Sequence, residues 1–146
     1  MANTFQGLAQ PSYIAQSCVP VSVSSTGAHT GVLMSAVGTN VASAILSVGA
    51  VTSLTSLDVK LQWSTDNSSF SDITGATFTQ VTAANQVQII DFTLPVAASD
   101  TAAAPIYVRA YSTLVGTSVL MAVNIIGCRQ FASSGSSFQN TSPIMN

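Results

Sequence analysis

Residues 57–64 alternate between apolar and polar side chains without a break. The odd positions hold Leu57, Val59, Leu61 and Trp63, and the even positions hold Asp58, Lys60, Gln62 and Ser64. A period of two is that of a β-strand with one face in a core and the other in solvent. Residues 65–69 are turn formers, and an apolar pattern resumes at Phe70. The segment predicts a β-hairpin whose Trp63 and Phe70 point into a core.

Strand patterns of this kind recur along the chain at intervals of about 8 to 12 residues, separated by turn signals. We expect further strands at residues 19–24, 31–37, 42–48, 77–81, 86–94, 106–111 and 119–127. No window of the sequence shows an amphipathic helical stripe with caps. The pattern predicts an all-β fold, a single antiparallel β-sandwich. Jelly-roll, immunoglobulin-like and barrel strand orders all remain open.

The strand expected at residues 119–127 is apolar on both of its faces. Val119, Met121, Val123 and Ile125 face one way, and Leu120, Ala122, Asn124 and Ile126 face the other. Such a strand is typical of one that is covered on both sides. We expect the core on one side and a partner or an arm of the chain on the other. A short buried helix is the alternative, which the β-branched residues and flanking glycines disfavour.

The two ends of the chain lack the strand period of the middle. Residues 1–17 are interpreted as an N-terminal arm, residues 18–130 as the sandwich domain, and residues 131–146 as a C-terminal tail or arm. The tail is uncharged and carries spaced apolar side chains: Phe131, Phe138, Ile144 and Met145. Frayed termini are common. The alternative hypothesis is a pair of arms that order on a neighbouring subunit, with these side chains as anchors.

Charged residues are rare, with three basic and five acidic side chains among 146 residues, or 5%. An ordinary soluble domain has about 25%. A surface of this kind has little charge repulsion and a small desolvation cost when a partner covers it. The composition therefore favours a subunit of an assembly. It argues against nucleic acid as a partner, because three scattered basic residues cannot contact several phosphates.

No apolar run reaches the 18 or so residues that a membrane-spanning helix needs, so no membrane partner is expected. The N-terminus also lacks the basic and apolar segments of a signal peptide. We therefore expect a protein made in a cytosol, where Cys18 and Cys128 are favoured as two buried free thiols over a disulfide.

The sequence offers little catalytic chemistry. His29 is the single histidine and has no flanking acid, and no Gly-x-Ser-x-Gly elbow occurs. Asp66 and Asp72 flank the hairpin turn, where turn chemistry explains them better than a calcium site does. Neither cysteine has a zinc-binding spacing. We expect no catalytic site, no metal site and no cofactor, and we interpret the chain as a protein that is not an enzyme. A hydrolase with an unrecognised site is the least favoured alternative.

Tyr107, Arg109 and Tyr111 share the face of their strand opposite to Ile106, Val108 and Ala110. Tyrosine and arginine are enriched at interface hot spots. This row is a candidate contact surface, and it suits a protein partner and a glycan equally well.

Three stretches together resemble small virion proteins of tailed bacteriophages. They are LDVKLQWSTDNSSFSDI with GATFTQV (residues 57–73 and 75–81), YVRA (107–110), and VGTS with the strand that follows it (115–127). The resemblance covers roughly residues 57 to 127. It implies a capsid decoration or cement protein, which sits on the outside of the icosahedral phage head at two-fold or three-fold positions. Such a protein clamps neighbouring major capsid proteins and is made in the host cytoplasm.

On this interpretation the chain is a virion structural protein and a homo-oligomer, either a dimer or a trimer. The predicted interface residues are Phe5, Tyr13, Phe131 and Phe138, with Tyr107, Arg109 and Tyr111 as a second surface. The alternative function is a glycan-binding or adhesion module of a phage tail or fibre. An exposed, concave patch lined by the two tyrosines of the second surface would favour that alternative.

Overall fold

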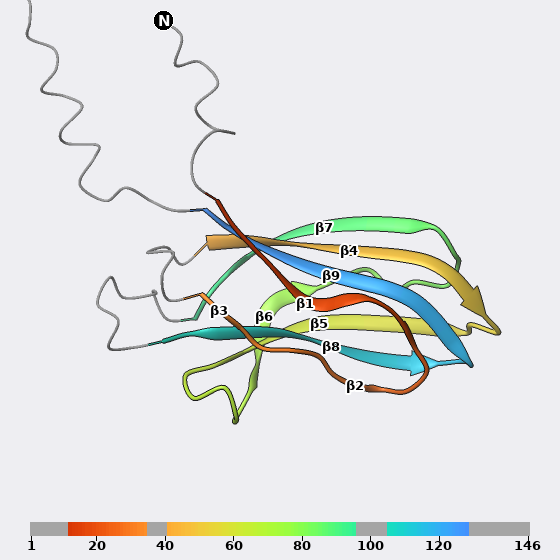
Figure 1. The fold of residues 1–146 in the computed structure, drawn as a ribbon, viewed down its shortest axis with the longest axis horizontal. Coiled ribbons are helices and arrows are strands. Elements are labelled where there is room, and N and C mark those ends of the chain that lie inside the picture. Colours follow the sequence, from red (N-terminus) through yellow and green to blue (C-terminus); the bar gives the residue numbers. More distant parts are fainter. Residues whose placement is uncertain (1–11, 35–40, 96–104, 129–146) are drawn as a thin grey trace, which may run out of the picture.

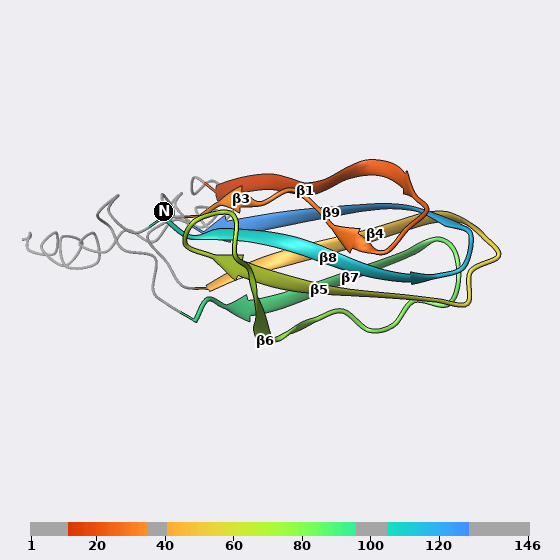
Figure 2. The same cartoon turned by 90° about the horizontal axis from the view of Figure 1, so that it is seen from below.

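The computed structural model describes residues 12–34, 41–95 and 105–128, and it is all-β and antiparallel, as predicted. The strands are β1 (Ser12–Val23), β2 (Gly27–Ala28), β3 (Val32–Leu33), β4 (Val41–Thr52), β5 (Ser56–Ser64), β6 (Ser71–Thr77), β7 (Gln86–Thr93), β8 (Tyr107–Val115) and β9 (Ser118–Cys128). They form a sandwich of two layers (Figures 1 and 2). One sheet has the order β1–β9–β4–β7, and the other has the order β2–β8–β5–β6, with β3 also paired to β8.

The strand order is that of a jelly roll. β1 pairs with β9, β2 and β3 pair with β8, β4 pairs with β7, and β5 pairs with β6, so four nested antiparallel pairs are rolled into two sheets. β2 and β3 act as one interrupted strand, because they contact β8 at Ser112 and at Val108 respectively. The structure thus decides between the strand orders that the sequence pattern left open.

The core lies between the two sheets and is built from alternate residues of each strand. Leu46 on β4, Leu57 and Leu61 on β5, Val108 on β8 and Ile125 on β9 are among its buried side chains. The inward sets predicted for β5 and β8 are confirmed by this burial, and the inward side of β4 follows the same alternation. In β9, whose two faces are both apolar, the structure places Val119, Met121, Val123 and Ile125 inward. The period of two therefore selects the core correctly in β5 and β8, where one face of the strand is polar.

Several predicted segments have different bounds in the structure. Of the strand expected at residues 31–37, the described residues 31–34 contain only the two-residue β3. β1 begins at Ser12, so residues 12–17 of the predicted N-terminal arm belong to a strand, and Ser12 pairs with Cys128 at the end of β9. Residues 78–81 contribute an isolated bridge between Val81 and Leu57 in place of a full strand. The rest of the predicted arms, residues 1–11 and 131–146, lies outside the described residues.

The register of β1 on β9 separates the two cysteines. Cys18 pairs with Val123, whereas Cys128 pairs with Ser12. Five strand positions correspond to about 17 Å, far beyond the Cα separation of about 7 Å that a disulfide tolerates. Cys18 is a buried free thiol, as predicted.

Gly116 begins the tight turn that carries the chain from β8 in one sheet to β9 in the other. Its φ of 147° is one that side-chain-bearing residues rarely adopt, and a Cβ atom there would lie 2.6 Å from the carbonyl oxygen of Ser53. Only glycine fits this close approach without displacing a neighbour.

Candidate functional site

The predicted row of Tyr107, Arg109 and Tyr111 lies on the outward side of β8, and all three side chains are half-buried. Across the sheet these residues pair with Ser64, Gln62 and Lys60 of β5. The outward side chains of the β2–β8–β5–β6 sheet are named here the polar face. Its charged members are Asp58, Lys60, Asp72 and Arg109, four of the six charged residues that the described part of the chain contains.

A chain of contacts holds the polar face together. Asp72 accepts hydrogen bonds from Lys60 Nζ at 2.7 Å and from Gln62 Nε2 at 2.8 Å. The Nε of Arg109 donates to Gln62 Oε1 at 2.9 Å, and Lys60 Nζ lies 5.6 Å from the ring centroid of Tyr111. The Lys60 and Gln62 hydrogen bonds lower the pKa of the Asp72 carboxyl from its ordinary value. The network fixes side chains that would otherwise be mobile, which reduces the entropy lost when a partner binds.

Phe70 belongs to this polar face, and the prediction that it points into the core is wrong. Its ring lies under the guanidinium of Arg109, with 3.8 Å between Arg109 Cζ and the ring centroid. The register explains the error: Ser71 pairs with Trp63 and shares its side of the hairpin, so Phe70 faces the other way. Trp63 packs against the core from a half-buried position, in agreement with the prediction.

The outward side of the β1–β9–β4–β7 sheet has a different composition. Its aliphatic side chains, named here the apolar face, are Ile14, Ile45, Val87, Ile89, Leu120, Ala122 and Ile126. Val87 and Ile89, neighbours on edge strand β7, are 68% and 66% exposed, and Ile14 on the opposite edge strand β1 is 63% exposed. Such exposure of several aliphatic side chains on one face is unusual. Asp91, beside Ser43 at one edge, is the charged side chain that the described strands place on this side.

The first half of β7 shows the most exposed part of this face, because residues 86–89 reverse the usual pattern. Gln86 and Gln88 share the side of Val48 and Leu46, toward the other sheet, whereas Val87 and Ile89 point outward. Gln88 is satisfied there by the backbone of Thr79, which donates to Oε1 at 2.8 Å and accepts from Nε2 at 2.9 Å. In the second half of the strand, Ile90 and Phe92 face the core.

A shallow hollow of about 340 Å³ lies beside these aliphatic residues. It opens on the outward side of β1, β9 and β4, and its lining includes Gln16, Pro20, Ser47, Gly49, Leu120 and Ala122. The small residues Gly49 and Ser47 lie at the bottom of the hollow, and the Leu120 side chain lies beside Gly49 and bounds one side of it. The pairing of β1 with β9 is irregular between Gln16 and Val21. Pro20, which lies at the edge of the hollow, falls within this bulged segment.

Of the remaining predicted interface residues, Tyr13 lies in β1, where its backbone pairs with Gly127. Phe5, Phe131 and Phe138 lie outside the described residues. The predicted residues are therefore not brought together in one place by the described structure. The β9 part of the apolar face was expected from the sequence, because residues 119–127 are apolar on both sides. The β7 part was missed, although the alternation of glutamine with aliphatic residues at 86–89 carries its signal.

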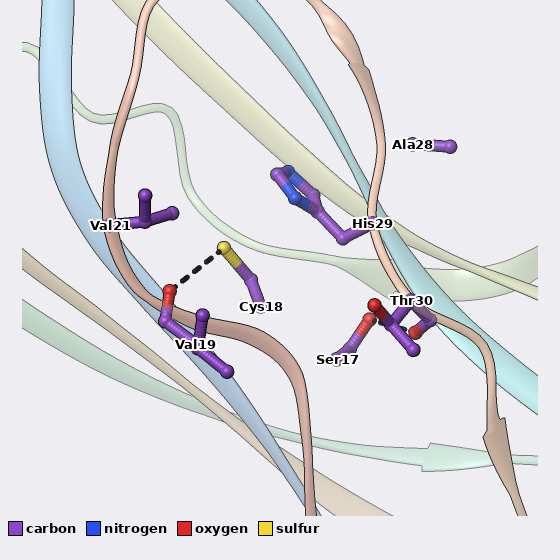
Figure 3. A pocket seen from close by; sticks show the side chains of 7 residues that line it. All are labelled: Ser17, Cys18, Val19, Val21, Ala28, His29 and Thr30. Carbon is purple, nitrogen blue, oxygen red and sulfur yellow. Dashed lines mark hydrogen bonds between the residues drawn. The ribbon is translucent and has the colours of Figure 1, made fainter.

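A second hollow, of about 430 Å³, lies between β1 and β2 and is lined in part by Cys18, His29 and Thr30 (Figure 3). His29 Nε2 lies 2.9 Å from Ser112 Oγ, and burial lowers the pKa of its imidazole. Burial also raises the pKa of the Cys18 thiol, which disfavours the reactive thiolate form. Ser17 Oγ bonds the backbone, donating to Thr30 O and accepting from Ala110 N. These contacts stabilise the sandwich edge and offer no activated nucleophile.

Asp66 in the hairpin turn acts as a backbone cap. Its Oδ1 accepts hydrogen bonds from Ser64 Oγ and from the amides of Ser68 and Ser69, all at 2.7–2.8 Å. These bonds lower the pKa of the carboxyl to about 2. The predicted turn role is confirmed for Asp66 and is wrong for Asp72, which lies in β6 and accepts cross-strand hydrogen bonds from Lys60 and Gln62 of β5. Across the described ranges, no cluster of three or more His, Cys, Asp or Glu side chains could hold a metal ion.

Within the part of the chain that the structure covers, no helix is long and apolar enough to cross a membrane.

Comparison with known proteins adds little to this description. No protein-family model matches the sequence, and no curated protein matches it. Among solved structures, a chain of the "Structure of infectious bursal disease virus Gx strain" is similar over 82% of this chain and 32% of that chain. The sequence identity is 10% and the TM-score is 0.49. Similarity at this level describes a distant likeness of chain path and has no bearing on function.

Proposed function

We propose that this chain is a virion structural protein of the decoration or cement class, which binds the outer surface of a tailed-phage head. The observation that carries the proposal is that one sandwich presents two unlike outer faces, both suited to contact. A subunit placed among neighbours needs contacts on more than one side, whereas a free catalyst does not. The jelly roll is also a common architecture of viral capsid domains, which supports the proposal by fold analogy alone.

The polar face is the proposed contact with the major capsid protein. Tyr107, Arg109 and Tyr111 are residue types enriched at hot spots, and hydrogen bonds or ring contacts already hold Arg109 and Lys60 in position. Binding to the assembled shell stabilises it by mass action, because the bound subunit must leave before the shell opens. Stable attachment needs an interface above about 1,000 Å² in total. The proposal includes no catalytic activity, no cofactor and no nucleic-acid partner.

Cosedimentation with capsids stripped of this protein tests the proposal. We expect saturable binding at a fixed copy number per capsomer and greater resistance of the shell to heat. Arg109→Ala is expected to weaken binding by tenfold or more, about 1.4 kcal/mol, while Thr82→Ala, an exposed change in the loop before β7, leaves it unchanged. A variant lacking residues 131–146 shows whether the predicted tail contributes to capsid binding. Absence of binding by the intact chain to any shell would end the proposal.

The alternative, a glycan-binding or adhesion module of a phage tail or fibre, has one observation in its favour. Lectin domains also use the jelly roll, and the polar face combines tyrosine rings with fixed hydrogen-bonding groups. However, the two hollows described above are lined by other residues, and Tyr107 and Tyr111 are half-buried on a sheet face. A glycan array with the purified protein distinguishes the two functions, since only the alternative predicts a hit that Arg109→Ala abolishes.

A further inference from the structure

We infer that the apolar face is the contact between two copies of this chain, packed sheet on sheet about a two-fold axis. The inference specifies the homo-oligomer within the proposed function, but it stands on the described residues and is tested without capsids. Four observations support it: the charge of the face, its size, its relief and the orientation of β7.

The charge of the apolar face suits a contact with itself. In a two-fold contact the same patch meets its own copy, so a face almost without charge brings no like charges together. Asp91 lies on the edge strand, away from the centre of the face, and accepts a hydrogen bond from Ser43. The polar face differs, because its four charged side chains would have to lose hydration in such a contact. A partner with a strongly charged surface would also lose hydration against aliphatic residues without gaining ion pairs.

The size of the apolar face matches what a dimer requires. Four strands about 4.8 Å apart, and eight positions about 3.4 Å apart, give a face of about 19 by 27 Å; the eight positions are those that pair β4 with β7 from Val41 to Val48. Its flat area is therefore roughly 500 Å² per copy, and a contoured surface exceeds that value. Specific interfaces begin at about 1,000 Å² in total, so two copies of this face reach the threshold.

The relief of the face is self-complementary. Val87 and Ile89 protrude from β7 at one edge, and the hollow of about 340 Å³ lies away from that edge, on β1, β9 and β4. Val87 is level with Ser47 and Ala122 in the register, and both of these residues line the hollow. A two-fold axis parallel to the strands, between β9 and β4, places β7 of each copy over β1 of the other and β4 over β9. The protruding residues of each copy then meet the β1 side of the partner's hollow, where Gln16 and Pro20 lie. Two sheets packed in this way are about 10 Å apart.

Sedimentation equilibrium of the purified full chain at several concentrations tests the inference, because it measures self-association. We expect a dimer whose dissociation constant rises by about 30-fold or more in Ile89→Asp, because two buried aliphatic side chains are lost and two carboxylates are introduced. Val115→Asp, which alters an exposed aliphatic residue of β8 on the other sheet, is the matched control and leaves the dimer intact. A monomer at all concentrations, or a dimer weakened equally by both substitutions, overturns the inference.

A cross-link tests the proposed axis directly. The double variant Gln16→Cys with Ile89→Cys places thiols on β1 and β7 at the same level of the sheet. Within one copy β9 and β4 separate them, and that separation, about 14 Å or more, exceeds the span of a short bismaleimide. Between copies the facing strands lie about 10 Å apart, so we expect a short bismaleimide to give a covalent dimer on a denaturing gel, whereas wild type, with its native cysteines, and Ile89→Cys alone do not. A dimer in solution without this cross-link overturns the axis.

Removal of residues 131–146 excludes one other occupant of the face. The inference expects the shortened chain to dimerise as the full chain does. Dimerisation that appears only after the removal would show that the tail covers the apolar face, and would overturn the inference. Because no shell is present, failure here leaves the cosedimentation result unaffected, and failure of capsid binding leaves the dimer unaffected.

Discussion

The two outer faces of this sandwich are built from the same strand geometry but differ in chemistry. On the polar face, Asp72, Gln62 and Arg109 form a connected series of hydrogen bonds that extends to Phe70 and Tyr111 through ring contacts. On the apolar face, Val87 and Ile89 project from β7 while glutamines turn inward. A polar surface can be held in place by its own hydrogen bonds, whereas an aliphatic surface gains stability only when another surface covers it.

The difference shows how a chain with so few charges distributes them. Asp58, Lys60, Asp72 and Arg109 lie on one sheet, and Asp66 lies in a turn of the same sheet. The other sheet is left almost uncharged in its described strands. One face therefore suits contact through oriented polar groups, and the other suits contact through buried area.

The largest expected effect is a difference in unfolding free energy between substitutions on the core side and on the outer side of the β1–β9–β4–β7 sheet. Leu46→Ala removes a fully buried side chain beneath the apolar face and is expected to lower the free energy of unfolding by about 2–5 kcal/mol. Ile89→Ala, on the outward side of the paired strand, is expected to change it by less than about 0.5 kcal/mol. Urea unfolding at a concentration low enough to keep the chain monomeric measures both. Equal losses would contradict the assignment of the two sides.

Gly116→Ala tests the turn that joins the two sheets. The new Cβ atom would lie 2.6 Å from Ser53 O at a φ of 147°. We expect a loss of about 1–3 kcal/mol in the free energy of unfolding. Gly27→Ala is the control, because no atom lies within 4 Å of its added Cβ. Thermal unfolding of both variants measures the effect, and a neutral Gly116→Ala would refute the close approach.

The polar network is expected to matter more for binding than for folding. Arg109→Ala loses the hydrogen bond to Gln62 and the contact with Phe70, at a cost of about 1 kcal/mol in unfolding free energy. Arg109→Lys is expected to behave similarly, since an ammonium does not reproduce a planar guanidinium on a ring. Chemical denaturation measures the unfolding free energy of both variants. A loss several times larger would mean that the network supports the core.

The smallest expected effect is a loss of local stability at acidic pH. The pKa of Asp66 is about 2 in the folded chain and ordinary, near 3.8, when unfolded; that of Asp72 is lowered as well. Stability from these carboxylates is therefore fully present above about pH 4 and falls as the pH drops toward 2. We expect the β5–β6 hairpin to loosen first, seen as faster amide exchange at Ser68 and Ser69, with little change in β4. Asp66→Asn should remove most of this pH dependence, and an unchanged profile in that variant would contradict the assignment.

Several parts of the candidate surfaces could be read from the sequence. The row Tyr107, Arg109 and Tyr111 was placed correctly outside, because it alternates with small or aliphatic residues that bury. Phe70 was misplaced, because the register of β6 on β5 depends on where the turn ends. The inverted side of β7 was missed, because both sides of Gln86–Ile90 contain residues that a sheet accepts, and the pattern alone does not show which side meets Leu46.

The amino-acid sequence by itself determined the fold class, the inward residues of β5 and β8, and the shortage of charge, because a period of two and a composition are properties of neighbours along the chain. Only the tertiary structure decided the jelly-roll order, the extension of β1 to Ser12, and the gathering of Ile14, Val87 and Leu120 on one outer face. These features depend on pairings between residues from opposite ends of the described chain, such as Ser12 with Cys128. The free energy of such pairings comes from packing and register across strands, which no local pattern contains.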